Sequence, residues 1–364
     1  MDAFRVQTHT VSLGHVDQPL ATFAKQYTSL QGMHSSQADT VASSLPRSGD
    51  AYILVFAHAL AYHKETWEPV ISRLFELQNR DGHSSPHIAE IWTVDCPDHG
   101  ESAALNKDVS ASALRAGRAS CRSYGGAILS LARSGLMHTS PRAKLVLIGH
   151  SAGSIGTVLS TAYRPSPGDI PVSSIILVEP WMVPADLLAA SPELRASIEA
   201  TSQAGLRRRD TWASHAKALE YFKAKGVWKT WDPRALDLYV RYGLASAKPD
   251  EHSVGGVTLA YPRQLEGEAY ADVGEGYEAL ERLSQICSSV PVHVILGEEN
   301  LKSSAAVQEK LCDREEGRCM ASVTVLPRTG HMAPQQSPGL VAEAIHKILI
   351  TCHASAPHTA RGRL

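Results

Sequence analysis

The sequence predicts an α/β fold in which a mostly parallel central sheet is flanked by helices. Short β-like runs alternate with helical segments along most of the chain, and several runs are continuously apolar, such as residues 53–56 and 175–178. A continuously apolar strand is buried on both faces, which is typical of a parallel sheet covered by helices. A third observation is a sharp-turn motif at residues 149–153, between one such run and a helical segment.

The periodicity places the elements in order along the chain. The runs expected to form the parallel strands are residues 51–57, 91–95, 144–149, 173–179, 290–296 and 321–326. The helical patterns between and after them are residues 65–78, 120–133, 151–162 and 340–350. Residues 5–12 and 22–27 are expected to add two antiparallel edge strands.

One core interrupted by an inserted segment is the expected domain organisation. A long, mostly helical pattern separates the runs that end at residue 179 and begin at residue 290, whereas a strand-to-helix connection normally takes a few residues. We therefore predict a helical lid at residues 181–285 over a core formed by residues 1–180 and 286–352. Residues 353–364 are expected to form a flexible tail.

The composition excludes several classes of function. The 364 residues are 43% hydrophobic and 20% charged, with a net charge of −2, so nothing favours nucleic-acid binding. No segment approaches the ~18 apolar residues of a membrane span. The six cysteines contain no CxxC pair, and Asp98 and His99 have no third ligand at a useful spacing. We expect reduced thiols, no metal and no cofactor.

The motif Gly-His-Ser-Ala-Gly at residues 149–153 presents a candidate nucleophile, Ser151. Because an apolar strand precedes it and a helix follows it, the serine is forced onto a tight turn with its hydroxyl exposed. A serine hydroxyl needs a base within hydrogen-bond reach, held in turn by an acid. The candidate base is His331, in a loop just beyond the last β-run. His150 is expected to pack in the core or to face the substrate.

From residue 51 to residue 346 the chain resembles the α/β-hydrolase superfamily. The resemblance rests on the tight turn at Ser151, called the elbow below, on the loop around His331, called the histidine loop, and on the order of the strands. This resemblance implies the α/β-hydrolase fold and the chain order serine, acid, histidine. It also identifies Asp-Cys-Pro-Asp-His-Gly-Glu-Ser at residues 95–102 as a loop that shapes a turn and carries no chemistry.

Two positions compete for the acid. Glu179 ends the strand after the elbow unit, and Pro180 biases it away from helix, which suits a side chain presented at a strand end. An acid at the end of an otherwise apolar strand is also hard to explain structurally. The alternative is the end of the next strand, where the superfamily usually has an aspartate. Asn300 stands near that place, and Glu298 or Glu299 are the substitutes.

The oxyanion hole is expected to use two backbone amides. One belongs to Ala152, the residue after the nucleophile, and the other comes from the loop after residues 51–57. In that loop Leu60 is the first choice and Ala59 the second. We expect His58 to bond to the backbone of its own loop.

The predicted lid carries an excess of basic residues. Residues 201–241 contain nine basic residues against four acidic ones. Such residues commonly form solvated helix faces, but fixed positive charge also focuses anions into a cleft. Arg207, Arg208 and Arg209 are therefore candidates for binding the phosphates of a phosphorylated substrate tail.

A narrower resemblance rests on residues 25–28, 57–59, 64–69 and 94–102. These segments are similar to fungal peroxisomal hydrolases of secondary metabolism, a group that includes the acyl-CoA hydrolase of mycophenolic acid biosynthesis and hydrolases of host-selective toxin pathways. The resemblance implies a CoA thioester as substrate, and it supports Glu179 as the acid. It also implies that Gly362-Arg363-Leu364 is an address for a peroxisomal import receptor. Without that signal the expected location is the cytoplasm.

These observations predict a serine hydrolase that cleaves an acyl-CoA thioester through Ser151, His331 and Glu179. One alternative keeps the enzyme and changes the reaction to that of a carboxylesterase, a lactonase or an acyltransferase on a small hydrophobic ester. The other is a ligand-binding homologue without turnover. The acyl group is not specified by the sequence, and an isologous homodimer is the default expectation for assembly.

Overall fold

The computed structural model describes residues 4–13, 20–30, 51–82, 86–107, 120–137, 143–163, 171–247 and 255–354, without the side chains of residues 301–304. Nearly all of the predicted tail, including Gly362-Arg363-Leu364, lies outside the described residues.

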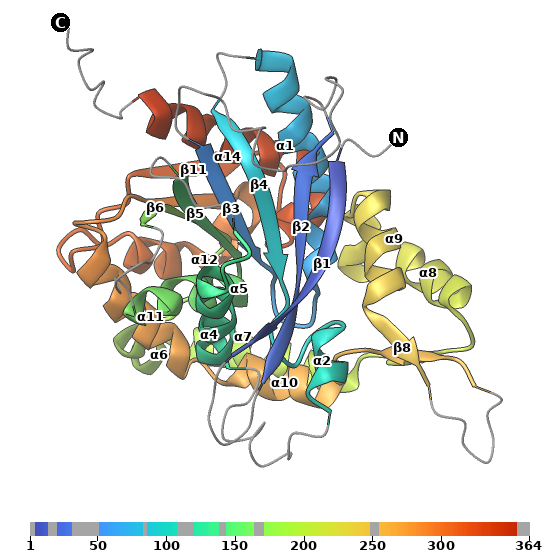
Figure 1. Ribbon diagram of the computed structural model, residues 1–364. Helices are drawn as coiled ribbons and strands as arrows, with labels where there is room; N and C mark the ends of the chain where they lie inside the picture. The colour runs from blue at the N-terminus through green and yellow to red at the C-terminus, as the bar shows by residue number, and fades with distance from the viewer. Residues whose placement is uncertain are drawn as a thin grey trace, which may run out of the picture.

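The predicted central sheet is present, and eight strands form it in the order β1-β2-β4-β3-β5-β6-β10-β11 (Figure 1). The strands are β1 (Phe4–Ser12), β2 (Ala21–Ser29), β3 (Ala51–Ala57), β4 (His87–Val94), β5 (Ala143–His150), β6 (Val172–Val178), β10 (Val292–Gly297) and β11 (Ser322–Leu326). The β1–β2 and β2–β4 pairs are antiparallel, and all other pairs are parallel. The sheet confirms both the predicted class and the two antiparallel strands.

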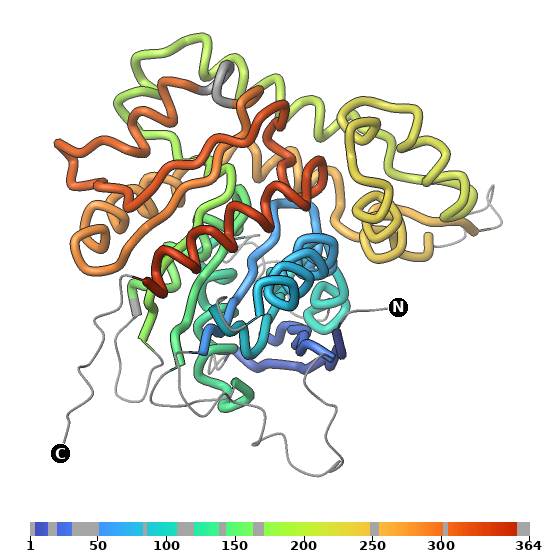
Figure 2. The backbone as a smooth tube through the Cα atoms, turned by 90° about the horizontal axis from the view of Figure 1, so that it is seen from above, coloured from blue at the N-terminus to red at the C-terminus, as the bar shows by residue number. Residues whose placement is uncertain are grey.

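Helices cover both faces of the sheet, as the continuously apolar strands require. On β3 all seven residues are buried, with Ile53 and Val55 in one hydrophobic cluster and Leu54 and Phe56 in the other. The first cluster is covered by α4 (Cys121–Arg133), α5 (Ala152–Leu159) and α11 (Gly274–Ile286). The second is covered by α1 (Glu68–Asp81) and α14 (Pro338–Ala354), which lie side by side in Figure 2. This period-two alternation places a separate core on each face.

Short elements complete the core around the strand ends. They are the 3-10 helices Lys64–Trp67 and Ser160–Tyr163 and the helices α2 (Ser102–Leu105), α12 (Glu298–Leu311) and α13 (Ala333–Gln336). The long helix predicted at residues 65–78 is thus a 3-10 turn followed by α1.

The elements of the inserted segment are α6 (Ala185–Ala190), α7 (Pro192–Arg207), β7 (Thr211–Trp212), α8 (His215–Ala224), the 3-10 helix Gly226–Thr230, α9 (Pro233–Tyr242), β8 (Leu244–Ser246), β9 (Val257–Leu259) and α10 (Arg263–Ala271). In Figure 1, α8, α9 and β8 of the inserted segment lie to the right of the sheet, whereas its α6, α7 and α10 lie near the lower end of the sheet. A small three-stranded sheet, β7-β9-β8, was not expected from the helical pattern. The next helix, α11, begins inside residues 181–285 and ends at Ile286, but it packs against α5 in the core.

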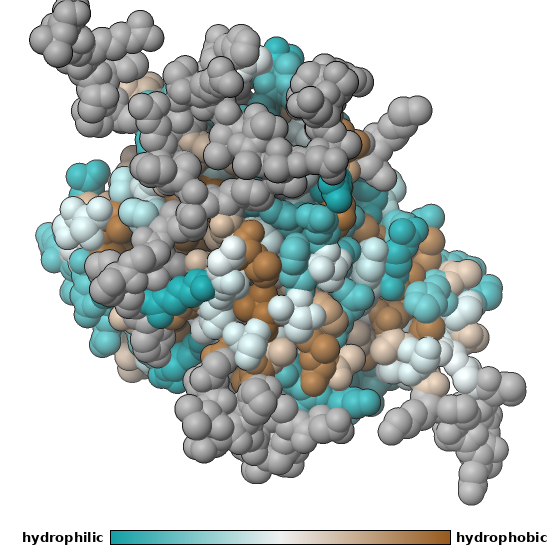
Figure 3. All heavy atoms as spheres, viewed as in Figure 1, coloured by the Kyte–Doolittle hydropathy of each residue, from teal (hydrophilic) through white to brown (hydrophobic). Residues whose placement is uncertain are grey.

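Hydrophobic residues on the surface are dispersed. On the face drawn in Figure 3 they are interspersed with hydrophilic residues. Exposed apolar side chains are spread over several elements, among them Val6 on β1, Leu105 on α2, and Val323 and Val325 on β11. Within the described part of the chain, no helix has both the length and the apolar character needed to cross a lipid bilayer.

Candidate active site

Ser151 occupies the sharp turn between a strand and a helix. Strand β5 ends at His150 and α5 begins at Ala152, so Ser151 alone makes the turn, with φ 53° and ψ −118°. This left-handed backbone is costly for a non-glycine residue. A Cβ on Gly153 would lie 2.4 Å from the Ala57 carbonyl oxygen, so only glycine allows α5 to approach the end of β3. The turn holds the hydroxyl at the carboxyl edge of the sheet.

A chain of hydrogen bonds joins the serine to a histidine and a glutamate. The Ser151 Oγ lies 3.0 Å from His331 Nε2, and His331 Nδ1 lies 3.1 Å from Glu179 Oε2. The Glu179 carboxylate is fully buried, while the His331 side chain is 34% exposed. The carboxylate can only accept, so His331 donates from Nδ1 and keeps Nε2 as the acceptor for the serine proton. The arrangement can generate a nucleophile.

The surroundings of Glu179 fix its carboxylate at the end of β6. Glu179 itself has a positive φ of 50°, and its amide donates to the Ile295 carbonyl at 2.8 Å. The Gly297 amide and the Asn300 side-chain amide also donate to the carboxylate. A Cβ on Gly297 would lie 2.3 Å from the Thr329 carbonyl oxygen, so this glycine allows the histidine loop to reach the acid.

The competing acids have other contacts. Glu298 accepts a hydrogen bond from the Arg328 amide at 3.0 Å, and Glu299 is exposed at the surface. Asn300, which occupies the usual place of the aspartate, donates to Glu179 instead of replacing it. The geometry therefore favours Glu179.

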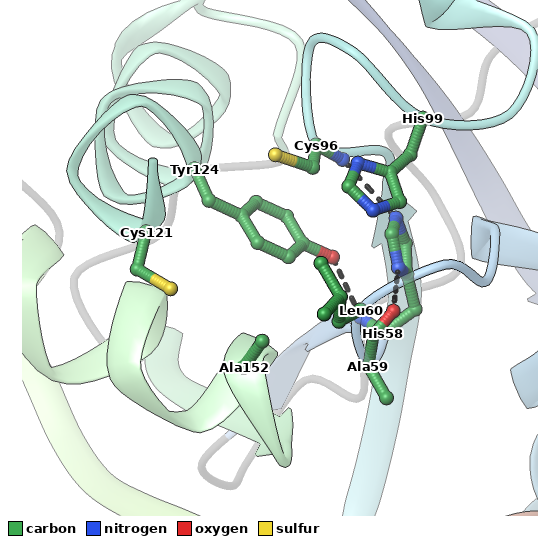
Figure 4. Close-up of a pocket in the computed structure, with 8 residues that line it drawn as sticks. All are labelled: His58, Ala59, Leu60, Cys96, His99, Cys121, Tyr124 and Ala152. Carbon is green, nitrogen blue, oxygen red and sulfur yellow. Dashed lines mark hydrogen bonds between the residues drawn. The ribbon is translucent and has the colours of Figure 1, made fainter. Parts of the chain in front are cut away.

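The two residues predicted to supply the oxyanion donors, Leu60 and Ala152, line one small cavity beside the elbow. The Ala152 amide is the first of α5, where an N–H has no intrahelical acceptor. In the facing loop, His58 Nδ1 donates to the Ala59 carbonyl at 2.8 Å, and its Nε2 accepts from the Cys96 amide at 3.1 Å (Figure 4). Because a trans peptide directs C=O and N–H to opposite sides, the Leu60 amide points away from His58. This geometry favours Leu60 over Ala59.

His58 and His150, which lie near the elbow, are neutral. Burial lowers the pKa of His58 well below its usual value, and the nearby His99 adds to the shift. Burial, followed by the proximity of His331, lowers the pKa of His150 to about 3. His150 Nε2 donates to the His331 carbonyl at 2.9 Å, so His150 packs in the core and holds the backbone of the histidine loop.

A buried ion cluster, absent from the sequence predictions, connects the two loops that follow β3 and β4. Asp95, at the end of β4, accepts from the Lys64 amide at 2.8 Å and from Lys64 Nζ at 3.1 Å. Lys64 also pairs with Glu65 at 2.9 Å. Burial alone lowers the pKa of Lys64, but the charges of Asp95 and Glu65 raise it above its usual value. The cluster supports the predicted structural role of the loop at residues 95–102.

We expected Asp98 and His99 to lack a third metal ligand, and the position of Cys96 corrects this expectation. Cys96, Asp98 and His99 each place a potential metal-ligating atom within 4.8 Å of the others, so a third candidate ligand exists. However, His99 Nδ1 lies 2.6 Å from the Asp98 carboxylate, and its Nε2 accepts from the Ala61 amide at 3.0 Å. Both nitrogens of His99 are engaged, which leaves no imidazole lone pair for a metal in this arrangement.

The three consecutive arginines are in different environments. Arg208 is largely buried and donates to Glu266 and to the Tyr239 hydroxyl, each at 2.7 Å. Its guanidinium is therefore engaged within the protein, contrary to its expected role as a phosphate ligand. Arg207 and Arg209 are exposed, and both remain candidates for that role.

The inserted segment contacts both loops of the site. Tyr62, just after the part of the β3 loop that carries Leu60, packs against Trp231 of the inserted segment with ring centroids 5.7 Å apart. The Tyr62 hydroxyl also lies 4.0 Å from the sulfur of Met332, the neighbour of the histidine. The Asp232 amide donates to the Gln335 carbonyl at 2.8 Å. A displacement of this segment would act on both loops.

Comparison with known proteins supports the same architecture. Residues 54–344 match the alpha/beta hydrolase family. The curated abhydrolase domain-containing protein AFT2-1 of Alternaria alternata is 32% identical over 125 residues, which are 34% of this chain and 42% of that protein. The alignment thus spans less than half of that relative.

Two solved structures show the fold across nearly the whole chain. The peroxisomal alpha-beta-hydrolase Lpx1 of Saccharomyces cerevisiae has a TM-score of 0.72 at 17% identity, covering 100% of this chain and 94% of its own. E-2-(acetamidomethylene)succinate hydrolase has a TM-score of 0.60 at 17% identity, covering 94% and 98%. At these identities the likeness concerns the fold alone.

Proposed function

The chain belongs to the alpha/beta hydrolase family, and from this premise we propose that it is a serine hydrolase with Ser151 as nucleophile, His331 as base and Glu179 as acid. The observation that carries the proposal is the continuous hydrogen-bond chain from the Ser151 hydroxyl through both nitrogens of His331 to the buried carboxylate. Serine at the elbow with this geometry is the arrangement used for acyl transfer.

The reaction proceeds in two halves. Ser151 Oγ attacks the carbonyl carbon of the substrate, and its proton passes to His331 Nε2. The Leu60 and Ala152 amides hold the resulting oxyanion, which collapses when His331 protonates the leaving group. Water then attacks the acyl-serine while His331 accepts its proton, and the return of this proton to Ser151 Oγ releases the carboxylic acid and restores the serine. Glu179 keeps the imidazole oriented and stabilises its charged form.

We propose a CoA thioester as the substrate. The proposal is supported by the exposed Arg207 and Arg209 in the basic segment, since fixed positive charge attracts the phosphates of CoA. We also assign residues 181–285 as the lid, with α11 as its anchor on the core. The lid assignment is supported by the contact of Trp231 with Tyr62 on one loop and by the hydrogen bond from the Asp232 amide to the Gln335 carbonyl beside the other.

The test is steady-state hydrolysis of acyl-CoAs and of the matching oxygen esters by the full chain, beside Ser151→Ala. We expect preference for the thioesters, loss of turnover in the variant, and labelling of Ser151 alone by a fluorophosphonate. Arg207→Ala combined with Arg209→Ala is expected to raise KM for acyl-CoA and leave KM for the uncharged esters unchanged. Absence of labelling contradicts the serine hydrolase, and equal turnover of both substrate sets contradicts the CoA assignment.

We also propose Gly362-Arg363-Leu364 as a peroxisomal address, on the resemblance of its pattern to known addresses. A fluorescent protein fused in front of the full chain should collect in peroxisomes and should become cytoplasmic when the last three residues are removed. An unchanged distribution would contradict this address.

A further inference from the structure

A cysteine, a histidine and a serine meet at the edge of the sheet opposite to Ser151. Cys352 lies near the carboxyl end of α14, His293 is the second residue of β10, and Ser322 is the first residue of β11. The Cys352 Sγ lies 3.7 Å from His293 Nε2, and His293 Nδ1 lies 2.8 Å from the Ser322 Oγ. A nucleophile, a base and a group that orients the base are therefore in hydrogen-bond contact.

The alternation of the strands brings these side chains to one face of the sheet. His293 is two residues before Ile295, which belongs to the hydrophobic cluster covered by α1 and α14. Cys352 packs against the same cluster, and Ser322 pairs with His293 across the two strands. Since side chains on one face recur every second residue, His293 and Ser322 both point toward α14.

His293 is suited to accept a proton from the thiol. The imidazole is 5% exposed, and burial lowers its pKa, so the ring is neutral near pH 7. When Nδ1 donates to the Ser322 hydroxyl, Nε2 is left as an acceptor. Because sulfur is only a weak acceptor, this tautomer, with the Cys352 thiol as the donor, is favoured.

Cys352 is held as a thiol until this proton is taken. Burial raises its pKa, although the Ser174 hydroxyl and the charge of Lys144 oppose the rise. The last turn of α14 has the same effect as burial, because the negative end of a helix dipole disfavours a thiolate and favours a positive imidazolium. An ordinary exposed thiol reacts through its thiolate, whereas a reaction at this sulfur depends on His293.

Polar groups beside the half-buried sulfur are placed to meet a small ligand. The Ser174 Oγ, on β6, is 1% exposed and has no nitrogen or oxygen partner among the described residues. Lys144, on β5, adds a positive charge, and its Nζ lies 5.7 Å from the centre of the Tyr52 ring. His353 packs against the same ring with centroids 6.4 Å apart. The surroundings of the sulfur thus combine a hydroxyl with a cation, which suits a small anion.

We propose that Cys352 is a site of reversible modification by thiol–disulfide exchange with a small, negatively charged disulfide, and that His293 is its general base. The Cys352 Sγ attacks one sulfur of the reagent while its proton passes to His293 Nε2. The disulfide bond of the reagent breaks as the mixed disulfide forms, and the departing sulfur takes the proton from His293 and leaves as a thiol. Displacement at sulfur forms no oxyanion, so a base and access to the sulfur are sufficient.

The test is incubation of the full chain with oxidised glutathione, with each modified cysteine identified and timed by peptide mass spectrometry. We expect one glutathionyl group on Cys352, gained faster than on the exposed Cys319 and removed by a reducing agent. A rate at Cys352 that is no faster than the rate at Cys319 overturns the proposal. Ser151→Ala should be modified at the same rate, so the result is independent of the proposed hydrolase activity.

The role of the base is tested by His293→Gln. At pH 7 this variant should slow the modification of Cys352 by about ten-fold or more, since a positioned base contributes at least that much. Between pH 7 and 8 the rate should stay nearly constant in the unaltered chain and should rise by about ten-fold in the variant, because only the thiolate then reacts. Equal rates or equal pH profiles in the two proteins overturn the role of His293.

A matched control and a second variant separate the base from a structural effect. His353→Gln, at the exposed histidine next to Cys352, should leave the rate and its pH profile unchanged. Ser322→Ala keeps the imidazole but removes the group that orients it, so it should also slow the modification. Thermal unfolding shows which variants are folded. If His293→Gln does not fold, an unchanged rate in Ser322→Ala overturns the role of the histidine.

The negative charge of the reagent is tested at Lys144. Lys144→Gln should slow the reaction of Cys352 with oxidised glutathione and leave its reaction with the uncharged 2-hydroxyethyl disulfide unchanged, because only the first reagent is attracted by the cation. An equal effect on both disulfides, or no effect on either, overturns the preference for a negative reagent.

Discussion

Two loops at the carboxyl edge of the sheet each carry a histidine, and the two side chains have opposite surroundings. His331 is 34% exposed and is bonded to a hydroxyl and a carboxylate. His58 is 1% exposed and is bonded to the backbone at Ala59 and Cys96. The comparison teaches that hydrogen-bond partners, more than position after a strand, separate a histidine that can exchange a proton from one that shapes a loop.

The largest effect on kcat is expected from a change to Glu179, the proposed acid bonded to His331. Glu179→Gln should lower kcat by about 10⁴-fold, because an amide no longer stabilises the charged imidazole or enforces its tautomer. Steady-state kinetics measure the loss. Glu298→Gln and Glu299→Gln are the matched controls and should stay close to the unaltered protein. A comparable loss in either control would reassign the acid to the end of β10.

A smaller effect on kcat is expected from a change to His58, in the loop after β3. His58→Gln should lower kcat by about 10- to 100-fold, below the full cost of deleting an oxyanion donor, because the Ala59–Leu60 peptide loses its orientation. KM and the pH profile of kcat/KM should not change, since His58 stays neutral. Exposed His215 provides the control variant, His215→Gln. A shifted pH profile in His58→Gln would mean that His58 also exchanges a proton during turnover.

The smallest effect concerns stability in acid. His150 has a pKa of about 3 when folded and about 6.5 when unfolded, so below pH 6.5 the unfolded chain binds more protons and stability falls as the pH falls. Between pH 6.5 and 5 the free energy of unfolding should drop by about 2 kcal/mol from this group. Above about pH 7.5 the contribution is constant. Urea unfolding over this range measures the slope.

The matched variant for the acid experiment is His150→Gln, which carries no titrating group at this position. Its free energy of unfolding should depend less steeply on pH than that of the unaltered chain. Identical slopes in the two proteins would show that His150 titrates with an ordinary pKa in the folded state.

The features that could be predicted from the sequence are those that depend on short stretches of neighbouring residues. The elbow follows from the spacing of Gly149, Ser151 and Gly153, because a strand, a turn and a helix leave little freedom within five residues. The parallel strands follow from their continuous apolar runs. The chain order also placed Glu179 and His331 near the right strand ends, although their contact depends on the pairing of β6, β10 and β11.

Other features depend on long-range packing that one sequence does not reveal. The small sheet β7-β9-β8 was missed because its strands are two or three residues long and pair across the inserted segment. Arg208 was grouped with its neighbours because local charge does not show that Glu266, far along the chain, comes to pair with it. Lys64 and Asp95 are separated in the sequence by a whole helix and a strand, so their ion pair in the core was likewise not predicted.

The placement of the acid on β6 affects when the site is assembled during synthesis. Ser151 and Glu179 belong to one strand-helix-strand unit, so nucleophile and acid leave the ribosome close together. The histidine follows only after the lid and β11 have been made. With the proposed triad, a nascent chain that has already folded its first six strands would still lack its base and would not hydrolyse a substrate.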